Sequence, residues 1–331
     1  MSEIVFLGER ENSIDKVFSL GRKERITAFG ECAPEIVGHH NLDQWKMQLS
    51  GVKYAFSTWG IPNFTQEEYN EYFPSLKYIF YAAGTVKKFA QNAFGHGIRI
   101  FSSRLSNAIP VAETVFAQII LANKGFYRSS MKASYKTKKK ISENYSGNYE
   151  ATVGIIGVGT IGTLLAERLK SLSVRVIVWD KFLTDERAKE LGVKKVSLET
   201  LFTESDVISN HLADKQETEG ILNYALFSKM KKYATFINSG RGRQVVEKDL
   251  VRALKKERGR TAVLDVTFPE PPAMFSPVMH TKNLIVTPHI DGSSGQEVVR
   301  MADEMIDSYL KIIDGQAVRN EIFLCDLATM A

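Results

Sequence analysis

The chain alternates short apolar runs with longer segments in which apolar residues recur at helical spacing. Within the first hundred residues, the apolar runs at 52–57, 76–81 and 98–102 are typical of short buried strands. A helix is expected to begin near Thr65, because the acidic residues that follow it suit the N-terminal end of a helix. Strands that alternate with helices in this way predict a parallel sheet.

A second strand–helix series runs from residue 151 to about residue 290. Its expected strands are the segments 152–156, 173–180, 206–211, 235–239, 261–266 and 283–287, each of which contains consecutive apolar residues. In open α/β sheets, ligands bind beyond the carboxyl ends of the strands. The residues that directly follow these runs are therefore the candidates for chemistry.

Three further segments connect or close these series. Pro110 is expected to open an apolar helix that runs to about Asn123, because proline is tolerated at the first helical position. Residues 124–150 are polar and aromatic with little periodicity, which predicts a connection across the surface. Apolar positions from Val298 to Ile313 indicate a final amphipathic helix.

Composition narrows the class of protein. A chain of 331 residues exceeds one ordinary core and predicts two domains, and 44% hydrophobic and 24% charged residues are typical of a soluble globular protein. The net charge of +5 is mild, and the basic run at 136–140 lacks the glycine–aromatic pattern of an RNA-binding module. This run is expected to be a solvated surface, so no nucleic-acid partner is predicted, although it can help to attract anionic substrates.

The cysteines and the N-terminus predict a cellular location. Cys32 and Cys325 lie far apart and match no metal-ligand spacing, which favours reduced thiols in a cytoplasmic protein. The N-terminus has no basic segment followed by a long apolar one, and no run of about 18 uninterrupted apolar residues occurs. We therefore expect neither a signal peptide nor a membrane partner.

The run 152–162 combines an apolar strand, a glycine turn and the start of a helix. Gly157, Gly159 and Gly162 fit the G-x-G-x-x-G dinucleotide fingerprint, in which the glycines permit the turn, the approach of a pyrophosphate and close helix packing. The phosphates are expected on the free N–H groups at the start of the helix, around Thr160 and Ile161.

A carboxylate follows the next expected strand. Asp180 lies about 20 residues past the glycines, where an acidic residue accepts hydrogen bonds from the ribose hydroxyls. A carboxylate at this position repels a 2′-phosphate, so the sequence favours NAD over NADP, whereas Lys181 can soften that preference.

Ionisable residues follow three successive expected strands. Arg241, Glu270 and His289 each have an ordinary structural explanation when taken singly: a surface ion pair, a solvated acid and a hydrogen-bonded histidine. Because the strand ends of one parallel sheet meet at one edge, the three residues are expected to converge on one site.

The sequence resembles the D-2-hydroxyacid dehydrogenase family over most of its length, most strongly from about residue 107 to residue 295. The matching segments are 107–113, the glycine run with Asp180, His211 with 217–221, and the stretches 238–242, 265–271 and 287–292.

The resemblance implies a role for each matched residue. Arg241 would bind the substrate carboxylate and polarise the C2 oxygen, because a guanidinium matches a carboxylate bidentately. His289 would be the general acid/base, and Glu270 would orient it and stabilise its charged form. His211, Ser239 and Asp265 would contact NAD, with Asp265 at the nicotinamide end, where the hydride is exchanged with substrate C2.

The resemblance also implies a substrate loop in the first domain. Backbone N–H groups of Ala83, Gly84 and Thr85 would bind the substrate carboxylate, and Trp59 would line the pocket or pack structurally. The chain has two lysines, Lys87 and Lys88, where the family usually continues with an acidic residue, so the identity of the acid stays open. The segment 212–214 lacks the family's usual proline, from which only a local loop change is expected.

As a whole, the resemblance implies an α/β protein of two Rossmann-like or flavodoxin-like domains. The NAD-binding domain, 108–293, would be inserted into a substrate domain made of 1–107 and 294–331, with a cleft between them and the glycines on one wall. The expected activity is NAD-dependent interconversion of a small D-2-hydroxy acid and its 2-keto acid by a homodimer, with segment 124–150 as a plausible contact. The alternatives are a non-catalytic, corepressor-like NAD-sensing protein on the same fold and another Rossmann enzyme, which would not explain the Arg–Glu–His order.

Overall fold

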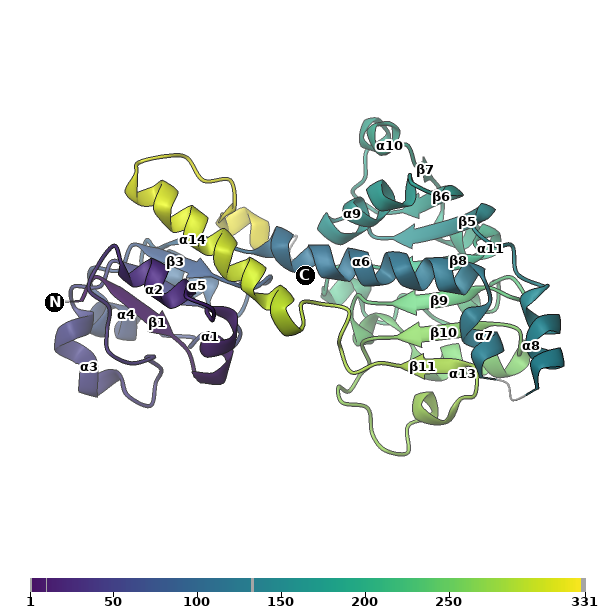
Figure 1. The fold of residues 1–331 in the computed structure, drawn as a ribbon, viewed down its shortest axis with the longest axis horizontal. Coiled ribbons are helices and arrows are strands. Elements are labelled where there is room, and N and C mark those ends of the chain that lie inside the picture. The colour runs from purple at the N-terminus through teal and green to yellow at the C-terminus, as the bar shows by residue number, and fades with distance from the viewer. Residues whose placement is uncertain (1, 10, 132–133, 329–331) are drawn as a thin grey trace. The chain divides into compact units, whose positions relative to one another are not determined.

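A computed structural model describes every residue of the chain except 1, 10, 132–133 and 329–331. It divides into two compact units (Figure 1). Unit 1 comprises Met1–Asn107 with Ser293–Met330, and unit 2 comprises Ala108–Gly292. Each unit has its own sheet and its own hydrophobic core.

Unit 2 contains a seven-stranded sheet in the order β11-β10-β9-β8-β5-β6-β7, and every strand pair in it is parallel. This is the strand order of the Rossmann fold with one further strand at an edge, and its order reverses between β5 and β8. The strands are β5 (Tyr149–Ile156), β6 (Ser173–Trp179), β7 (Lys194–Lys195), β8 (Val207–Asn210), β9 (Thr235–Asn238), β10 (Thr261–Leu264) and β11 (Leu284–Val286).

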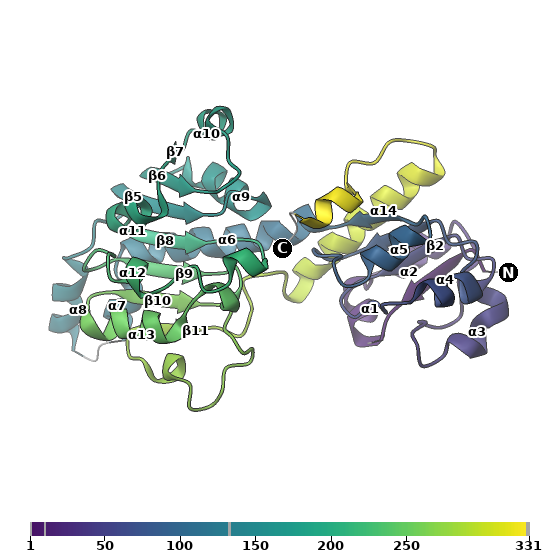
Figure 2. The same ribbon diagram turned by 180° about the vertical axis from the view of Figure 1, so that it is seen from behind.

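Helices cover both faces of this sheet, as Figures 1 and 2 show from opposite sides. Side chains of β5 such as Val153 and Ile155 pack with α6 (Arg104–Asn123), α9 (Thr160–Leu169) and α10 (Asp185–Leu191) on one face. Neighbouring strand residues pack with α11 (Leu198–Glu204), α12 (Tyr224–Phe227) and α13 (Glu247–Lys256) on the other. Burial on both faces explains the nearly continuous apolar sequences of β10 and β11. Two short helices, α7 (Phe126–Ser130) and α8 (Tyr135–Ser142), and the 3-10 turns η1 (Gln216–Thr218), η2 (Gly242–Gln244) and η3 (Pro277–His280) complete the unit.

Unit 1 contains a five-stranded sheet in the order β1-β2-β3-β4-β12, in which only β12 is antiparallel to its neighbour. Residues Cys32 and Val37 form isolated parallel bridges to β1, so the segment between them occupies the edge position next to β1. With this segment the order is flavodoxin-like. The strands are β1 (Ile4–Leu7), β2 (Tyr54–Ser57), β3 (Tyr78–Tyr81), β4 (Arg99–Ser102) and β12 (Glu321–Ile322).

Alternate residues of these strands enter two cores, as the two-residue period of a strand requires. Ile4 and Phe6 of β1 pack in the core that holds α14 (Val299–Ile313), whereas Val5 and Leu7 pack in the core on the other face. The first core also receives α1 (Glu11–Val17) and α2 (Arg22–Thr27), and the second receives α3 (Leu42–Leu49), α4 (Gln66–Tyr72) and α5 (Ala90–Gly95). The 3-10 turns η4 (Gly295–Val298) and η5 (Leu324–Ala328) flank the C-terminal elements of this unit.

The predicted α/β class and nearly all predicted elements are confirmed, including the helix after Thr65, which is capped by the Thr65 and Glu68 side chains. The predicted helix start at Pro110 is wrong, because α6 begins at Arg104 and Pro110 lies inside it. Proline removes one hydrogen bond, to the Ser106 carbonyl, but the apolar face of α6 still packs in the core of unit 2 and outweighs that loss.

Two other expectations need correction or comment. Segment 124–150 is not a simple connection, because it contains α7 and α8. By length and composition alone, α6 qualifies as a membrane-spanning helix, yet half of its apolar window is buried and Val115 and Ile119 lie in the core. It is therefore a core helix of unit 2.

Candidate functional site

The carboxyl ends of the parallel strands of unit 2 carry the predicted chemistry. The residues that follow β5, β6, β8, β9, β10 and β11 lie along the same edge of the sheet, as strand order and register require. They include the predicted residues Gly157, Gly159, Thr160, Ile161, Gly162, Asp180, His211, Ser239, Arg241, Asp265, Glu270 and His289.

The glycine turn after β5 is tightly packed on one side and open on the other. Gly157 has a left-handed φ of 86°, and a Cβ there would lie 2.9 Å from the backbone of His211. A Cβ on Gly162 would lie only 2.1 Å from the Gly157 oxygen, whereas a Cβ on Gly159 would meet no atom within 4 Å. Two glycines therefore close the turn, and the third leaves its outer surface accessible.

The start of α9 provides donors at this open surface. Gly159 is the N-cap residue, so the N–H groups of Thr160 and Ile161 begin the first turn without partners within the helix. An exposed glycine followed by free helix N–H groups fits a dinucleotide pyrophosphate.

Asp180 is tied to the glycine turn by its own carboxylate. Its Oδ2 accepts a hydrogen bond from Val158 N–H at 2.7 Å, and its Oδ1 accepts from Phe182 and Leu183 N–H at 2.7 and 3.1 Å. A carboxylate oxygen accepts two hydrogen bonds, so Oδ2 retains capacity for a ribose hydroxyl. Lys181 forms an ion pair with Glu217 at 3.2 Å.

His211 is buried behind the turn. Its Nε2 lies 2.8 Å from Ser209 Oγ, and its Nδ1 has no partner among the described residues. Burial lowers the pKa of His211 to about 3, so the imidazole is neutral at physiological pH. His211 therefore contributes hydrogen bonding and shape here, not charge.

A network of three buried amides lies beneath the loop that carries Arg241. Asn210 Nδ2 donates to Asn238 Oδ1 at 2.9 Å and to Gln244 Oε1 at 2.7 Å. Gln244 in turn accepts from Arg241 N–H at 3.1 Å and donates to the carbonyls of Leu212 and Ala213. The three amide residues are fully buried, so this network fixes the loops after β8 and β9 together.

The Arg241 side chain is partly buried, and its Nη1 donates to the Gly240 carbonyl at 2.8 Å. No carboxylate in the described part of the chain pairs with this guanidinium. Gly242, the next residue, has no room for a side chain, because a Cβ would lie 2.1 Å from the Thr267 backbone. This close contact brings the Arg241 loop against the loop that carries Glu270.

His289 and Glu270 form a pair. The His289 Nδ1 lies 2.6 Å from Glu270 Oε1, and both side chains are about half exposed. His289 Nε2 forms no hydrogen bond or ion pair with a described residue, which leaves this nitrogen available to a substrate. Arg241 shares no hydrogen bond or ion pair with either residue in the described chain.

Asp265 and Ser239 are turned toward the protein. The Asp265 carboxylate accepts from Thr287 Oγ1 at 2.7 Å and from the N–H groups of Ile290 and Asp291 at 2.8 and 3.0 Å. Ser239 Oγ donates to Asp291 Oδ2 at 2.5 Å, and Gln118 Nε2 donates to Asp291 Oδ1 at 2.9 Å. Asp291 and Gln118 were not predicted; the only signal for Gln118 is a polar residue on the apolar stripe of α6.

In unit 1, the predicted substrate loop follows β3. The Ala83 N–H already donates to the Tyr81 carbonyl at 2.8 Å, whereas the N–H groups of Gly84 and Thr85 donate to no described residue. Ser102 Oγ donates to the carbonyls of Ala83 and Gly84 and fixes the loop. Two free N–H groups therefore remain in this loop for an anion.

Trp59 follows β2, the strand next to β3, and is 40% exposed. Its neighbour Thr58 is buried and donates its hydroxyl to the Ala82 carbonyl at 2.7 Å. An exposed indole beside an anchored residue leaves both the pocket and the packing interpretation of Trp59 open.

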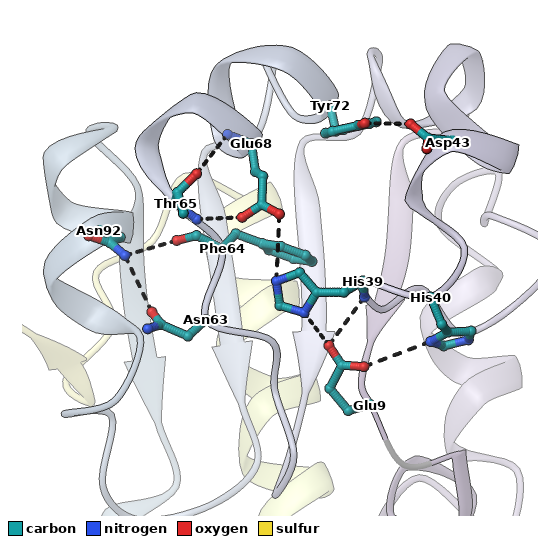
Figure 3. Close-up of polar contacts among 10 residues, drawn as sticks. All are labelled: Glu9, His39, His40, Asp43, Asn63, Phe64, Thr65, Glu68, Tyr72 and Asn92. Carbon is teal, nitrogen blue, oxygen red and sulfur yellow. Dashed lines mark hydrogen bonds and ion pairs between the residues drawn. The ribbon is translucent and has the colours of Figure 1, made fainter.

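A second polar cluster lies beyond the end of β1 (Figure 3). The His39 imidazole bonds to Glu9 through Nδ1 and lies 3.6 Å from Glu68 through Nε2, while His40 lies 3.8 Å from Glu9. Burial acts to raise the pKa of Glu9, but hydrogen bonds from His39 and the charges of His39 and His40 outweigh it and lower that pKa. The cluster joins the loop after β1 to α4, whose Glu68 also completes the cap with Thr65.

Together, the strand order and the glycine turn at its reversal point define a dinucleotide-binding α/β protein. Residues 116–291 match the family described as "D-isomer specific 2-hydroxyacid dehydrogenase, NAD binding domain". The chain belongs to the D-isomer-specific 2-hydroxyacid dehydrogenase family.

Individual relatives agree with this assignment. The D-3-phosphoglycerate dehydrogenases of Archaeoglobus fulgidus and Bacillus subtilis are each 32% identical over 231 residues, which cover 69% of this chain and 43% of those proteins. The chain thus spans less than half the length of these curated relatives.

Solved structures share the fold. The NAD-complexed D-isomer-specific 2-hydroxyacid dehydrogenase of Lactobacillus delbrueckii ssp. bulgaricus aligns with a TM-score of 0.75 at 19% identity, over 96% of this chain and 99% of that one. The D-mandelate dehydrogenase of Rhodotorula graminis aligns with a TM-score of 0.76 at 19% identity, over 96% of both chains. The predicted family, fold class and NAD cofactor are confirmed, while the roles of individual residues stay predictions.

Proposed function

We propose that the protein interconverts a D-2-hydroxy acid and its 2-keto acid with NAD. The observation that carries this proposal is the 2.6 Å contact between His289 and Glu270, at the same sheet edge as Arg241, which has no carboxylate partner among the described residues. An acid/base pair and a free guanidinium beside a dinucleotide loop match what the reduction of a 2-keto acid needs.

Each residue has one task in this proposal. Arg241 binds the carboxylate and the C2 oxygen of the substrate, and the buried amides of Asn210, Asn238 and Gln244 hold its loop. In the direction of reduction, His289 gives the proton on Nε2 to the C2 oxygen; in the reverse direction Nε2 takes it back. Glu270 accepts the hydrogen bond from Nδ1, which fixes the tautomer and stabilises the charged ring.

The cofactor supplies or accepts the hydride at C2 when it is bound. We assign the pyrophosphate to the glycine turn at Gly159, the ribose to Asp180 and the nicotinamide end to the region of Ser239 and Asp265. Since Lys181 pairs with Glu217, it does not offer a free cation for a 2′-phosphate, which supports NAD over NADP.

We assign the substrate-binding role to unit 1 through the N–H groups of Gly84 and Thr85. The Ala83 N–H is excluded from that role by its bond to Tyr81, so Ala83 serves only to shape the loop.

We also infer a homodimer through segment 124–150, because Phe126, Tyr135 and Tyr149 expose 49%, 81% and 69% of their surface. Light scattering of the purified protein tests this, and a monomer at micromolar concentration would contradict it.

The function is tested by NADH oxidation with a panel of 2-keto acids. Loss of the general acid/base is expected to lower kcat by about 10² to 10⁴ in His289→Ala, and Arg241→Ala should raise KM for the keto acid as well. His280→Ala is the matched control, because that histidine is exposed on η3 and, within the described part of the chain, its ring bonds only to the Met274 carbonyl. Turnover at the wild-type level in both site variants would refute the assignment, and NADH binding without turnover of any acid would favour the NAD-sensing alternative.

A further inference from the structure

His289 has a backbone conformation that its surroundings must enforce. Its φ of 55° lies in the left-handed region, which residues other than glycine rarely adopt. Such a conformation persists in a folded protein only where neighbouring contacts determine it, and it is frequent at functional sites. The contacts of segment 287–291 therefore decide where the imidazole points.

Asp265 holds this segment from the end of β10. Its carbonyl accepts the His289 N–H at 3.0 Å, and its carboxylate accepts the Thr287 hydroxyl and the N–H groups of Ile290 and Asp291. These bonds fix the backbone on both sides of His289. They do not anchor the C-terminal end of the segment to any other element of the unit.

Asp291 provides that second anchor. Its carboxyl accepts from Ser239 Oγ, which follows β9, at 2.5 Å and from Gln118 Nε2, on α6, at 2.9 Å. Asp291, Ser239 and Gln118 are 2%, 8% and 8% exposed. A carboxyl this deeply buried is costly, because few donors replace the water it loses.

We propose that Asp291 is a positioning residue, whose buried carboxyl accepts hydrogen bonds from Ser239 and Gln118 and thereby holds His289 in place for catalysis. This inference rests on the proposed function in that it takes His289 as the acid/base. It adds a residue that itself touches neither substrate nor cofactor.

Three titratable groups face the Asp291 carboxyl: Asp265, His289 and Tyr127 of α7. Burial raises the pKa of Asp291 to about 6, and the Asp265 charge adds to that rise, while the bonds from Ser239 and Gln118 and the His289 charge oppose it. Gln118 Oε1 is buried and has no described partner, so after the amide flips this oxygen can accept a hydrogen bond from the O–H of a neutral Asp291 carboxyl. The anchor therefore survives protonation, although its charge does not.

Two substitutions of Asp291 distinguish the effect of its hydrogen bonds from the effect of its charge. In Asp291→Asn, the new amide still accepts from Ser239 and donates to the turned Gln118 Oε1, so the bonds remain and the charge is lost. In Asp291→Ala both bonds are lost. Gln118→Met is a milder variant that removes one hydrogen-bond donor on α6. Asp206→Asn is the matched control, because Asp206 directly precedes β8, at the opposite edge of the sheet, and its carboxylate accepts hydrogen bonds from the Thr152 N–H and Lys231 Nζ.

The position of His289 is measured by NMR of protein labelled in its histidine rings, and His289→Gln identifies the signal. We expect one sharp His289 signal in the wild type, Asp291→Asn and Asp206→Asn, and a broadened or multiple signal in Asp291→Ala and, to a smaller degree, in Gln118→Met. An unchanged signal in Asp291→Ala and Gln118→Met would overturn the proposal, as would equal disturbance by Asp291→Asn and Asp291→Ala.

Kinetics supply the functional readout on the same variants. A displaced acid/base is expected to lower kcat by about 10- to 100-fold in Asp291→Ala while KM for NADH stays at the wild-type value. Asp291→Asn should recover most of that loss, and a variant in which KM rises while kcat holds would contradict a positioning role. If the wild type turns over no acid, the proposed function fails, and the NMR result still decides the inference.

Discussion

Gly159 and Gly162 belong to the same turn, yet a methyl group added to each should have different effects on stability. At Gly162 the new Cβ would lie 2.1 Å from the Gly157 oxygen, and the closest distance that real Cβ atoms show is about 3.0 Å. The turn must therefore move by about 1 Å. At Gly159 the new Cβ meets no atom within 4 Å, and the φ of −73° is ordinary for alanine.

The expected magnitudes follow from these contacts. Gly162→Ala should destabilise the protein by about 1 to 3 kcal/mol, the usual cost of overpacking. In Gly159→Ala, the unfolded chain has less conformational entropy, which stabilises the folded state by about 0.4 to 1 kcal/mol. Alanine is a poorer N-cap than glycine and costs about as much, so the free energy of unfolding should hardly change. The Gly159 methyl would nevertheless occupy the open surface to which we assign the pyrophosphate, so NADH affinity should fall at least about tenfold, or about 1.4 kcal/mol.

The assay combines urea unfolding with titration of NADH into each variant. The reasoning predicts loss of affinity without loss of stability in Gly159→Ala, and loss of both in Gly162→Ala. Wild-type NADH affinity in Gly159→Ala would show that no pyrophosphate approaches this surface. A wild-type unfolding midpoint in Gly162→Ala would refute the tight packing of the turn.

Three further predictions concern residues around this turn and the acid/base pair. Asp180→Asn keeps an acceptor for Val158 N–H but loses the charge, so the ratio of NADH to NADPH affinity should fall, and an unchanged ratio would count against ribose recognition. Gln244→Leu leaves the buried partners of the amide network unsatisfied and should cost at least about 2 kcal/mol in urea unfolding together with a higher KM for the keto acid. Because the pKa of Asp291 rises from 3.8 to about 6 on folding, the folded state keeps this proton to a higher pH than the unfolded state does. The contribution of Asp291 to wild-type stability should therefore fall by about 3 kcal/mol as pH rises from about 4 through 6. Asp291→Asn should lack this fall and be more stable than the wild type at pH 7, and identical stability curves against pH would disprove the raised pKa.

Much of the fold is readable from the sequence because its strands are buried on both faces. The runs 235–239 and 261–266 each contain adjacent apolar residues, Phe236 and Ile237 in the first and 262–264 in the second, and they match β9 and β10 within two residues. The glycine spacing was equally informative, because the turn after β5 leaves no room for a Cβ at Gly162.

Other features depend on tertiary contacts that no local pattern encodes. The start of α6 lies six residues before Pro110, because packing in unit 2 outweighs one lost hydrogen bond. The neutral His211 follows from its burial, and the role that we propose for Asp291 follows from donors that are distant in sequence, Ser239 and Gln118. The sequence alone indicates only that Asp291 lies two residues after His289.

The central claim is that His289, oriented by Glu270, protonates the C2 oxygen of a 2-keto acid while NADH reduces it. The most direct test is a single-turnover measurement of NADH oxidation by the wild type and by His289→Gln, each at saturating NADH and with the keto acid that the panel identifies. The account predicts equal NADH binding in both, rapid formation of the D-2-hydroxy acid in the wild type and a rate lower by about 10² or more in the variant. Equal rates in the two proteins, or an L-configured product, would contradict it.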